Sequence, residues 1–269
     1  MSVSVNVART ATGAPGRLRG ALAVLEYHLL TYRRTWRGSS LSSFLLPLLT
    51  MLGFGVGVGS YVAGGVNGVP YLDYIVPGLI AVTAMQTAIG ESTWPVLSGF
   101  QWTKTYAAQA AAALRVTDIL NGHLSYVLLR VLLSSFVFLL VAAAFGALHS
   151  PWSLVAPPIA VLVGLAVAAP TFAFSASVTN DNALSLLYRF AVIPMTLFAG
   201  VFFPVESLPV ALRWLAYLSP LWHGVDLCRA ATLGVAPEWS ALGHLLYLAA
   251  WSGGGLALAY RCFRSRLVI

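Results

Sequence analysis

Several uninterrupted apolar stretches are the feature of this sequence that most restricts how the chain can fold. A helix of about 20 apolar residues crosses a hydrocarbon core of about 30 Å, and several stretches here reach that length. Of the 269 residues 59% are hydrophobic and only 9% are charged, whereas an ordinary soluble domain carries about 25% charged residues. The sequence therefore predicts an all-α integral membrane protein.

Six transmembrane helices are expected, joined by shorter and more polar segments. Their predicted ranges are 41–63, 72–97, 124–148, 153–178, 185–204 and 240–260. Together they make up a permease domain over residues 41–269.

The basic residues predict how these spans are oriented, because cytosolic loops carry an excess of Lys and Arg. Six arginines precede the first predicted span, Lys104 and Arg115 lie between the second and third, and three arginines follow the sixth. Both termini are therefore expected in the cytosol, in a multi-pass protein of the plasma or inner membrane. The net charge of +7 belongs to this topology, and no nucleic-acid partner is expected.

The N-terminal 40 residues divide into two parts. Residues 1–16 show no periodicity and are expected to form a disordered cytosolic leader. Over 17–40, apolar residues recur at steps of three or four, which predicts an amphipathic helix at the inner membrane surface. This helix is either an interfacial anchor alone or an anchor that also touches a partner through Arg33, Arg34 and Arg37.

A cytosolic segment over 99–122 links the second and third predicted spans. It can form one or two short helices and carries Lys104, Arg115 and Asp118. A short helix that projects from the bilayer can dock into a groove on a partner protein. An ordinary inner loop is equally compatible with these residues.

The segment 204–234 is too polar for two spans and too apolar for a loop. It predicts two short helices: Ser207 caps the first, Ser219 and Pro220 break the chain, and Gly234 ends the second. We expect a re-entrant helical hairpin that dips into the outer leaflet.

Enzyme chemistry has little support in the sequence. A phosphate-binding loop of the Walker type needs a Gly-Lys pair, but the sole lysine is Lys104, and Thr103 precedes it. The five histidines have no metal-ligand spacing. No catalytic, cofactor-binding or metal-binding residues are therefore predicted, and ATP could drive the protein only through another subunit.

A set of short motifs runs through most of the chain in a characteristic order. They are YRRTWRGS (32–39), Pro47, the glycine ladder 53–59, YLDYIVPGL (71–79), Glu91 with Ser92, LRVTDILNGH (114–123), LFAGVFFPVESLP (197–209) and LSPLWHGVDLCRAATLG (218–234). In order and spacing they resemble the type-2 ABC exporter permeases, especially the nodulation-factor exporter group and the drug and polysaccharide export permeases. The chain departs from many members of that family at Ala112 and Ala113, where they carry Thr-Pro.

The resemblance implies a six-helix permease that pairs with a second copy or a paralogue and with two cytosolic ATPase subunits, which bind ATP and Mg. The helix 17–38 and the segment 99–122 would dock on the ATPases, and the hairpin 204–234 would close the exit on the outer side. Substrates of this group are amphiphilic: lipid-linked saccharides, lipo-oligosaccharides or hydrophobic drugs.

Glu91 is the clearest acid inside a predicted span, and two interpretations of it remain open. It either lies at the mouth of the substrate path or pairs with an arginine or a helix terminus near the interface. Aromatic side chains could line the path for such a substrate, although interface belts explain them equally well. These aromatic residues are Trp94, Phe198, Phe202, Phe203 and Trp222.

A second class of function competes with the exporter. The chain could be an ATP-independent lipid flippase, or a membrane enzyme that acts on lipid-linked substrates. Co-purification of a separate ATPase favours the exporter, whereas activity in liposomes without any ATPase favours the alternative.

Overall fold

The computed structural model describes residues 17–62 and 64–268. The predicted leader 1–16 lies outside this part, as do the side chains of Arg37 and Pro47. The α-helices of the described residues are α1 Arg17–Thr50, α2 Tyr71–Ser92, α3 Trp94–Gln101, α4 Thr105–Ala111, α5 Val116–Ala144, α6 Ala156–Ser177, α7 Asp181–Leu187, α8 Ile193–Phe198, α9 Val210–Leu218, α10 Pro220–Leu233 and α11 Ala241–Leu267. Shorter helical turns are η1 Met51–Gly57, η2 Val58–Ser60, η3 Pro151–Val155, η4 Tyr188–Val192 and η5 Val205–Ser207.

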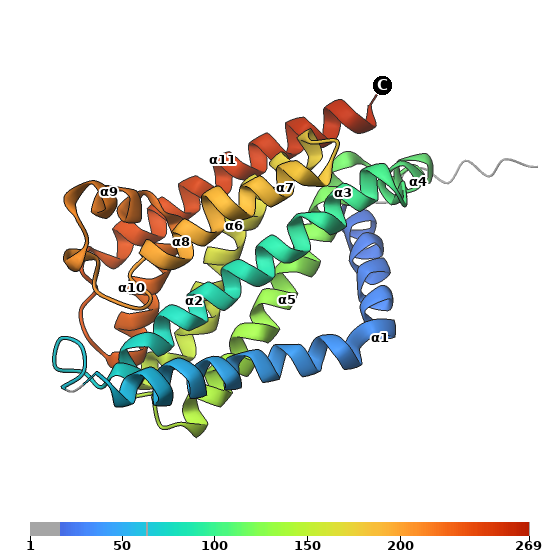
Figure 1. Cartoon of the computed structure of the whole chain (residues 1–269). Helices are drawn as coiled ribbons and strands as arrows, with labels where there is room; N and C mark the ends of the chain where they lie inside the picture. The colour runs from blue at the N-terminus through green and yellow to red at the C-terminus, as the bar shows by residue number, and fades with distance from the viewer. Residues whose placement is uncertain (1–16, 63, 269) are drawn as a thin grey trace, which may run out of the picture.

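The long helices run side by side, and the short helices gather at the two ends of the bundle (Figure 1). One end holds α9 and α10, and the other holds α3, α4, α7 and the C-terminal end of α11. In the described ranges, β pairing is limited to an isolated bridge between Val66 and Val69, so the all-α prediction is confirmed.

Four helical segments of the described residues are long and apolar enough to cross a membrane: Tyr71–Gln101, Val116–Ala144, Pro151–Ser177 and Ala241–Leu267. They correspond to the predicted spans 72–97, 124–148, 153–178 and 240–260. The first predicted span covers the end of α1 and the shorter apolar helix Leu48–Ser60, which is not among these four segments. The fifth is divided into α7, η4 and α8 and ends at Phe198. The count of six spans therefore stays a prediction.

Local chemistry explains where the boundaries differ from the predicted ones. Thr93 separates α2 from α3 with φ −100° and ψ −94°, and Pro95 lies in the first turn of α3. Helix α5 begins at Val116 because the Asp118 carboxylate, in the first turn, accepts the backbone N–H of Arg115 just before the helix. The prediction that Ser207 caps the first helix of the segment 204–234 was wrong. The Ser207 hydroxyl donates to the Pro204 carbonyl at 2.6 Å, and Pro209 occupies the position before α9.

Helix α1 joins the predicted amphipathic helix to the start of the first predicted span, and Figure 1 shows it turning between two parts. Its first part packs along the beginning of α5. A Cβ at Gly122 of α5 would lie 2.5 Å from the Cβ of Val24, so this approach requires glycine. The first part of α1 is therefore held on the bundle by α5.

Helix α6 forms the centre of the bundle and packs against α2, α5, α10 and α11. Glycines permit two of these approaches: a Cβ at Gly224 of α10 would overlap the side chain of Val163, and one at Gly255 of α11 would lie 2.6 Å from Cδ of Pro170. Small residues bring helices close together where lipid supplies no hydrophobic drive for association.

Candidate functional site

A buried tyrosine anchors the short helix α4 to the bundle. The Tyr106 hydroxyl lies 2.6 Å from Nδ1 of His123 in α5. Its ring centroid lies 4.7 Å from that of Phe100 in α3 and 5.3 Å from that of Phe263 in α11. Burial raises the pKa of the Tyr106 phenol, which therefore stays neutral. A displacement of α4 must move these neighbours, because the side chain is only 1% exposed.

Helix α1 joins the same cluster through His28. Its ring stacks on His123 at 4.0 Å between centroids and on Tyr126 at 5.2 Å. Burial lowers the pKa of His28 to about 4, so the ring is neutral at pH 7. We call His28, Phe100, Tyr106, His123 and Phe263 the inner aromatic cluster.

The predicted coupling residues occupy different positions at this end. Arg33, Arg34, Lys104 and Arg115 are exposed, whereas Arg37 lies outside the described side chains. Asp118 is only 3% exposed, and its carboxylate accepts the backbone N–H of Arg115 at 3.1 Å. It therefore caps α5. Arg115 and Asp118 also border a polar cavity of about 810 Å³, together with Tyr260 and Arg264.

Small residues form the outward face of α4. Ala107, Ala108 and Ala111 are exposed, and Trp102 next to the helix is 62% exposed. Such a face can approach the wall of a partner's groove closely, because no long side chain holds the backbones apart.

Glu91 pairs with an arginine within the bundle. Its carboxylate lies 3.4 Å from the guanidinium of Arg130, and Arg130 also lies over the Tyr32 ring at 4.4 Å from the centroid. The structure therefore shows the ion-pair arrangement, one of the two interpretations that the sequence left open.

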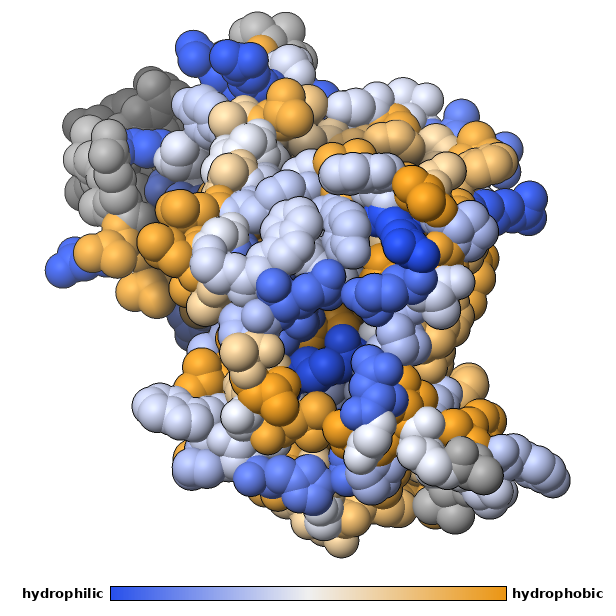
Figure 2. Space-filling view, turned by 90° about the vertical axis from the view of Figure 1, so that its left-hand side faces the viewer, coloured by the Kyte–Doolittle hydropathy of each residue, from blue (hydrophilic) through white to orange (hydrophobic). Residues whose placement is uncertain are grey.

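At the opposite end, Arg229 of α10 binds the segment that follows α8 and the side chain of Tyr74 in α2. The Arg229 guanidinium donates to the Gly200 carbonyl at 2.8 Å and lies 4.3 Å from the centroid of the Tyr74 ring. Gly200 has a φ of +74°, a conformation that favours glycine. Figure 2 shows this end of the molecule, with hydrophilic side chains near the centre and hydrophobic ones around them.

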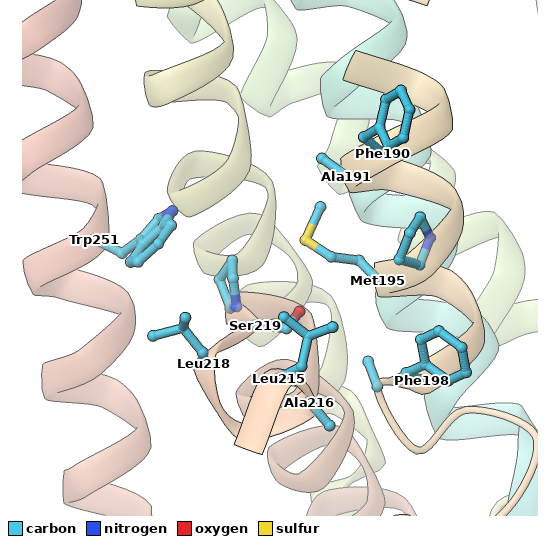
Figure 3. Close-up of a pocket in the computed structure, with 12 residues that line it drawn as sticks. Phe190, Ala191, Met195, Phe198, Leu215, Ala216, Leu218, Ser219 and Trp251 are labelled. Atoms are coloured by element: carbon cyan, nitrogen blue, oxygen red, sulfur yellow. The ribbon is translucent and has the colours of Figure 1, made fainter. Parts of the chain in front are cut away.

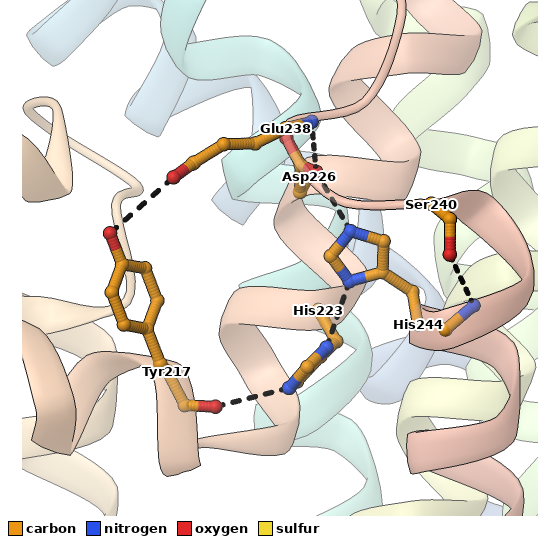
Figure 4. Close-up of polar contacts among 7 residues, drawn as sticks. Tyr217, His223, Asp226, Glu238, Ser240 and His244 are labelled. Carbon is orange, nitrogen blue, oxygen red and sulfur yellow. Dashed lines mark hydrogen bonds and ion pairs between the residues drawn. The ribbon is translucent and has the colours of Figure 1, made fainter.

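Two histidines and an aspartate form a buried polar network at the same end (Figure 4). His223 of α10 contacts His244 of α11, and His244 contacts Asp226 of α10 at 2.9 Å. Burial and the adjacent His244 lower the pKa of His223 to about 4. The sequence showed these residues only as scattered histidines, because the partners are 18 to 21 positions apart.

An apolar groove opens between α8 and α11, and α9 and the start of α10 lie across one end of it (Figure 3). Its volume is about 230 Å³, and Phe198, Met195, Leu215 and Trp251 are among its lining residues. A second apolar cavity of about 350 Å³ shares Met195 and Trp251 and reaches Pro170 of α6. Together they form a continuous apolar surface along α8.

The six predicted path residues do not meet in one site. Glu91 pairs with Arg130, Trp94 contacts Tyr188, and only Phe198 lines the groove. Phe202 lies against Phe54, Phe203 is half-buried, and Trp222 is 2% exposed within an aromatic group with Tyr217 and Trp239.

The helical bundle and its match to known sequences define a membrane transport permease. Residues 20–233 match the ABC-2 type transporter family, and the chain belongs to this family. It is similar to Nodulation protein J of Sinorhizobium fredii (strain NBRC 101917 / NGR234), at 30% identity over 82% of this chain and 86% of the relative. It is also similar to Nodulation protein J of Rhizobium leguminosarum bv. viciae, at 30% identity over 79% and 82%. The Inner membrane transport permease YadH of Escherichia coli (strain K12) is 24% identical over 82% and 89%.

Proposed function

We propose that this chain is the permease subunit of an ATP-binding-cassette exporter that moves an amphiphilic substrate out of the cytosol or inner leaflet. Two separate cytosolic ATPase subunits bind ATP and Mg and supply the energy, and a second permease copy or a paralogue completes the complex. Both termini lie in the cytosol, and the hairpin 204–234 dips into the outer leaflet. The chain has no nucleotide-binding site of its own.

The observation that carries this proposal is the attachment of α4. A transport subunit must convert movement of a partner into movement of its helices, and Tyr106 connects α4 to α3, α5 and α11 through buried contacts. The alanine face of α4 is left free for the partner. An ordinary loop would not need this buried connection.

The apolar groove supports the substrate class. Its lining is almost wholly hydrophobic (Figure 3), so it could take up the apolar part of an amphiphilic molecule, as mostly apolar pockets take up small ligands in general. The relative named Inner membrane transport permease YadH supports transport across the inner membrane.

Reconstitution with the ATPase tests the proposal. The full complex in liposomes should hydrolyse ATP and export substrate, whereas Ala108→Arg on α4 should abolish ATPase co-purification and leave the amount of permease in the membrane unchanged. Ala236→Arg, at the opposite end, is the matched control and should retain the ATPase. Export of substrate by the permease alone, without ATPase, would instead support a flippase.

A further inference from the structure

The polar cavity at the α4 end of the bundle lies between the start of α5 and the last turns of α11. Its volume of about 810 Å³ is within the range of about 300 to 1,000 Å³ that is usual for small-ligand sites. Thr117 and Asn121 of α5 and Tyr260 of α11 line it, together with the two arginines Arg115 and Arg264. Side chains from two helices therefore bring guanidinium, hydroxyl and amide groups to one cavity, and all of these groups can donate hydrogen bonds.

Neither guanidinium of the cavity is paired with an acid of the described residues. The ion pairs found in that part of the chain involve neither Arg115 nor Arg264, and both side chains are exposed. Asp118, the one acid among the described lining residues, is buried and accepts the backbone N–H of Arg115. Its carboxylate also lies against Gly20 of α1, where an added Cβ would be 2.6 Å from Oδ2. Two guanidinium charges and one carboxylate leave the cavity with an excess of positive charge.

Helix length places this cavity at the membrane surface. Helix α11 lies in one of the segments able to cross a membrane, and it carries no Asp, Glu, Lys or Arg from Ala241 to Tyr260. Tyr260 lies 19 residues after Ala241, which is about 28 Å along a helix, and Arg264 follows one turn later. Since the hydrocarbon core is about 30 Å thick, both side chains lie at the level of the lipid headgroups.

An apolar strip leads away from the cavity along α5 and α11, which contact each other. Residues at steps of three or four share one face of a helix. Such steps lead from Asn121 of the cavity to Leu128 and Leu132 of α5, and from Tyr260 to Ala257 of α11. Leu128 is half-buried, and Leu132 and Ala257 are exposed. A polar cavity that continues into an apolar strip has the same division as a phospholipid, with its charged headgroup and its acyl chains.

We propose that the cavity binds the phosphodiester headgroup of an anionic phospholipid from the leaflet at the α4 end, and that the acyl chains lie along the apolar strip. A guanidinium can donate two parallel hydrogen bonds to a phosphate, and basic pockets between transmembrane helices bind anionic headgroups. The excess positive charge disfavours a zwitterionic lipid, because its choline group would lie close to an arginine. A free phosphate ion offers the same oxygens to the cavity but gains nothing from the strip.

Native mass spectrometry of the full chain tests this proposal. The protein is released from micelles that contain equal amounts of phosphatidylglycerol and phosphatidylcholine with identical acyl chains, and the two lipids retained on it are counted. Phosphatidylglycerol is the anionic probe, and phosphatidylcholine is its zwitterionic counterpart. The measured quantity is the ratio of the two lipids on the protein.

Two substitutions each remove one guanidinium of the cavity, Arg264→Gln from α11 and Arg115→Gln from the start of α5. Asp118 binds the backbone of Arg115, so Arg115→Gln leaves that hydrogen bond in place. Arg261→Gln is the matched control, because Arg261 is exposed at the same end of α11 and does not line the cavity. Tyr260→Phe removes the hydroxyl group alone.

The parent should retain phosphatidylglycerol about ten-fold over phosphatidylcholine, the preference that one charge-assisted hydrogen bond supplies. Arg264→Gln and Arg115→Gln should each retain the two lipids almost equally, whereas Arg261→Gln should keep the preference of the parent. Tyr260→Phe should lose about three-fold, because a neutral hydroxyl contributes less than a charged donor. An excess of inorganic phosphate should leave the bound phosphatidylglycerol in place.

Equal retention of the two lipids by the parent would overturn the proposal, as would cavity variants that behave like Arg261→Gln. Displacement of the lipid by inorganic phosphate would also overturn it and assign the cavity to a free anion. An unchanged lipid ratio in both cavity variants, together with loss of a co-purifying partner, would assign the cavity to an acidic segment of that partner instead. If one cavity variant fails to reach the membrane, the other still decides.

The inference goes beyond the proposed function and does not depend on it, because the lipid ratio is measured without an ATPase and without transport.

Discussion

The close approach of α6 and α11 can be tested with three consecutive glycines of α11. A Cβ at Gly255 would lie 2.6 Å from Cδ and 2.7 Å from N of Pro170, whereas Cβ atoms at Gly253 and Gly254 would have no neighbour within 4 Å. A Gly→Ala substitution in a helix raises the free energy of unfolding by up to about 1 kcal/mol, because alanine has the higher helix propensity. All three positions share that gain, and only Gly255→Ala adds overpacking, which costs about 1 to 3 kcal/mol.

We therefore expect Gly255→Ala to have a free energy of unfolding about 2 kcal/mol below that of Gly254→Ala. For chains of this size such a difference shifts the midpoint of thermal unfolding by about 4 to 8 °C. The purified variants are compared in one lipid nanodisc preparation, by the loss of monodisperse protein with temperature. Gly253→Ala serves as a second control and should match Gly254→Ala.

A double-mutant cycle identifies the cause. Pro170→Ala removes the Cδ atom that the new methyl group meets, so the cost of Gly255→Ala should fall in that background. Equal midpoints for Gly255→Ala and Gly254→Ala would refute the reasoning, because α11 could not then lie as close to Pro170 as the structure places it.

Three further predictions concern the end of the bundle that holds α4. Tyr106→Phe removes the bond to His123 and leaves a buried imidazole nitrogen without a partner, so the free energy of unfolding should fall by about 1 to 3 kcal/mol and ATPase coupling should weaken. Glu91→Gln leaves the charge of Arg130 without its carboxylate, so it should lower the free energy of unfolding by about 2 kcal/mol, less than for a fully buried pair. The double variant Glu91→Gln with Arg130→Gln should regain part of that free energy in the same unfolding assay. His28 has a pKa of about 4 in the folded protein against 6.5 in the unfolded chain, so below pH 6.5 the unfolded chain binds a proton that the folded protein does not, and the free energy of unfolding falls as the pH falls towards 4. In the same unfolding assay, His28→Phe should therefore lose less stability than the parent between pH 7 and 4.5.

The sequence predicted the helical class, the family and four of the segments able to span a membrane. The segments could be predicted because a stretch of about 20 apolar residues indicates a helix surrounded by lipid. It predicted less well where helices are interrupted. The break at Thr93 and the division of the fifth predicted span into α7, η4 and α8 depend on local backbone geometry, which a count of apolar residues does not contain.

Site residues were harder to predict because the contacts join distant parts of the chain. Asp118 was predicted as a coupling residue from its place in the segment 99–122; its bond to the backbone N–H of Arg115 at the start of α5 could not be predicted in the same way. Tyr106 is the one large side chain of the alanine-rich segment after Lys104, and this is the signal that would have identified it. Nothing in the spacing of His223 and His244 predicts that their rings meet, since that contact depends on how α10 packs against α11.

Helix α11 contacts both ends of the molecule. Phe263 belongs to the inner aromatic cluster with Tyr106 of α4, and His244 lies 2.8 Å from His223 of α10, between their Nδ1 atoms. The two residues are 19 positions apart in one helix, which corresponds to about 28 Å, close to the thickness of a hydrocarbon core of about 30 Å. The close contact of Gly255 with Pro170 lies between these two points, so α11 is packed tightly against α6 about midway between the two ends.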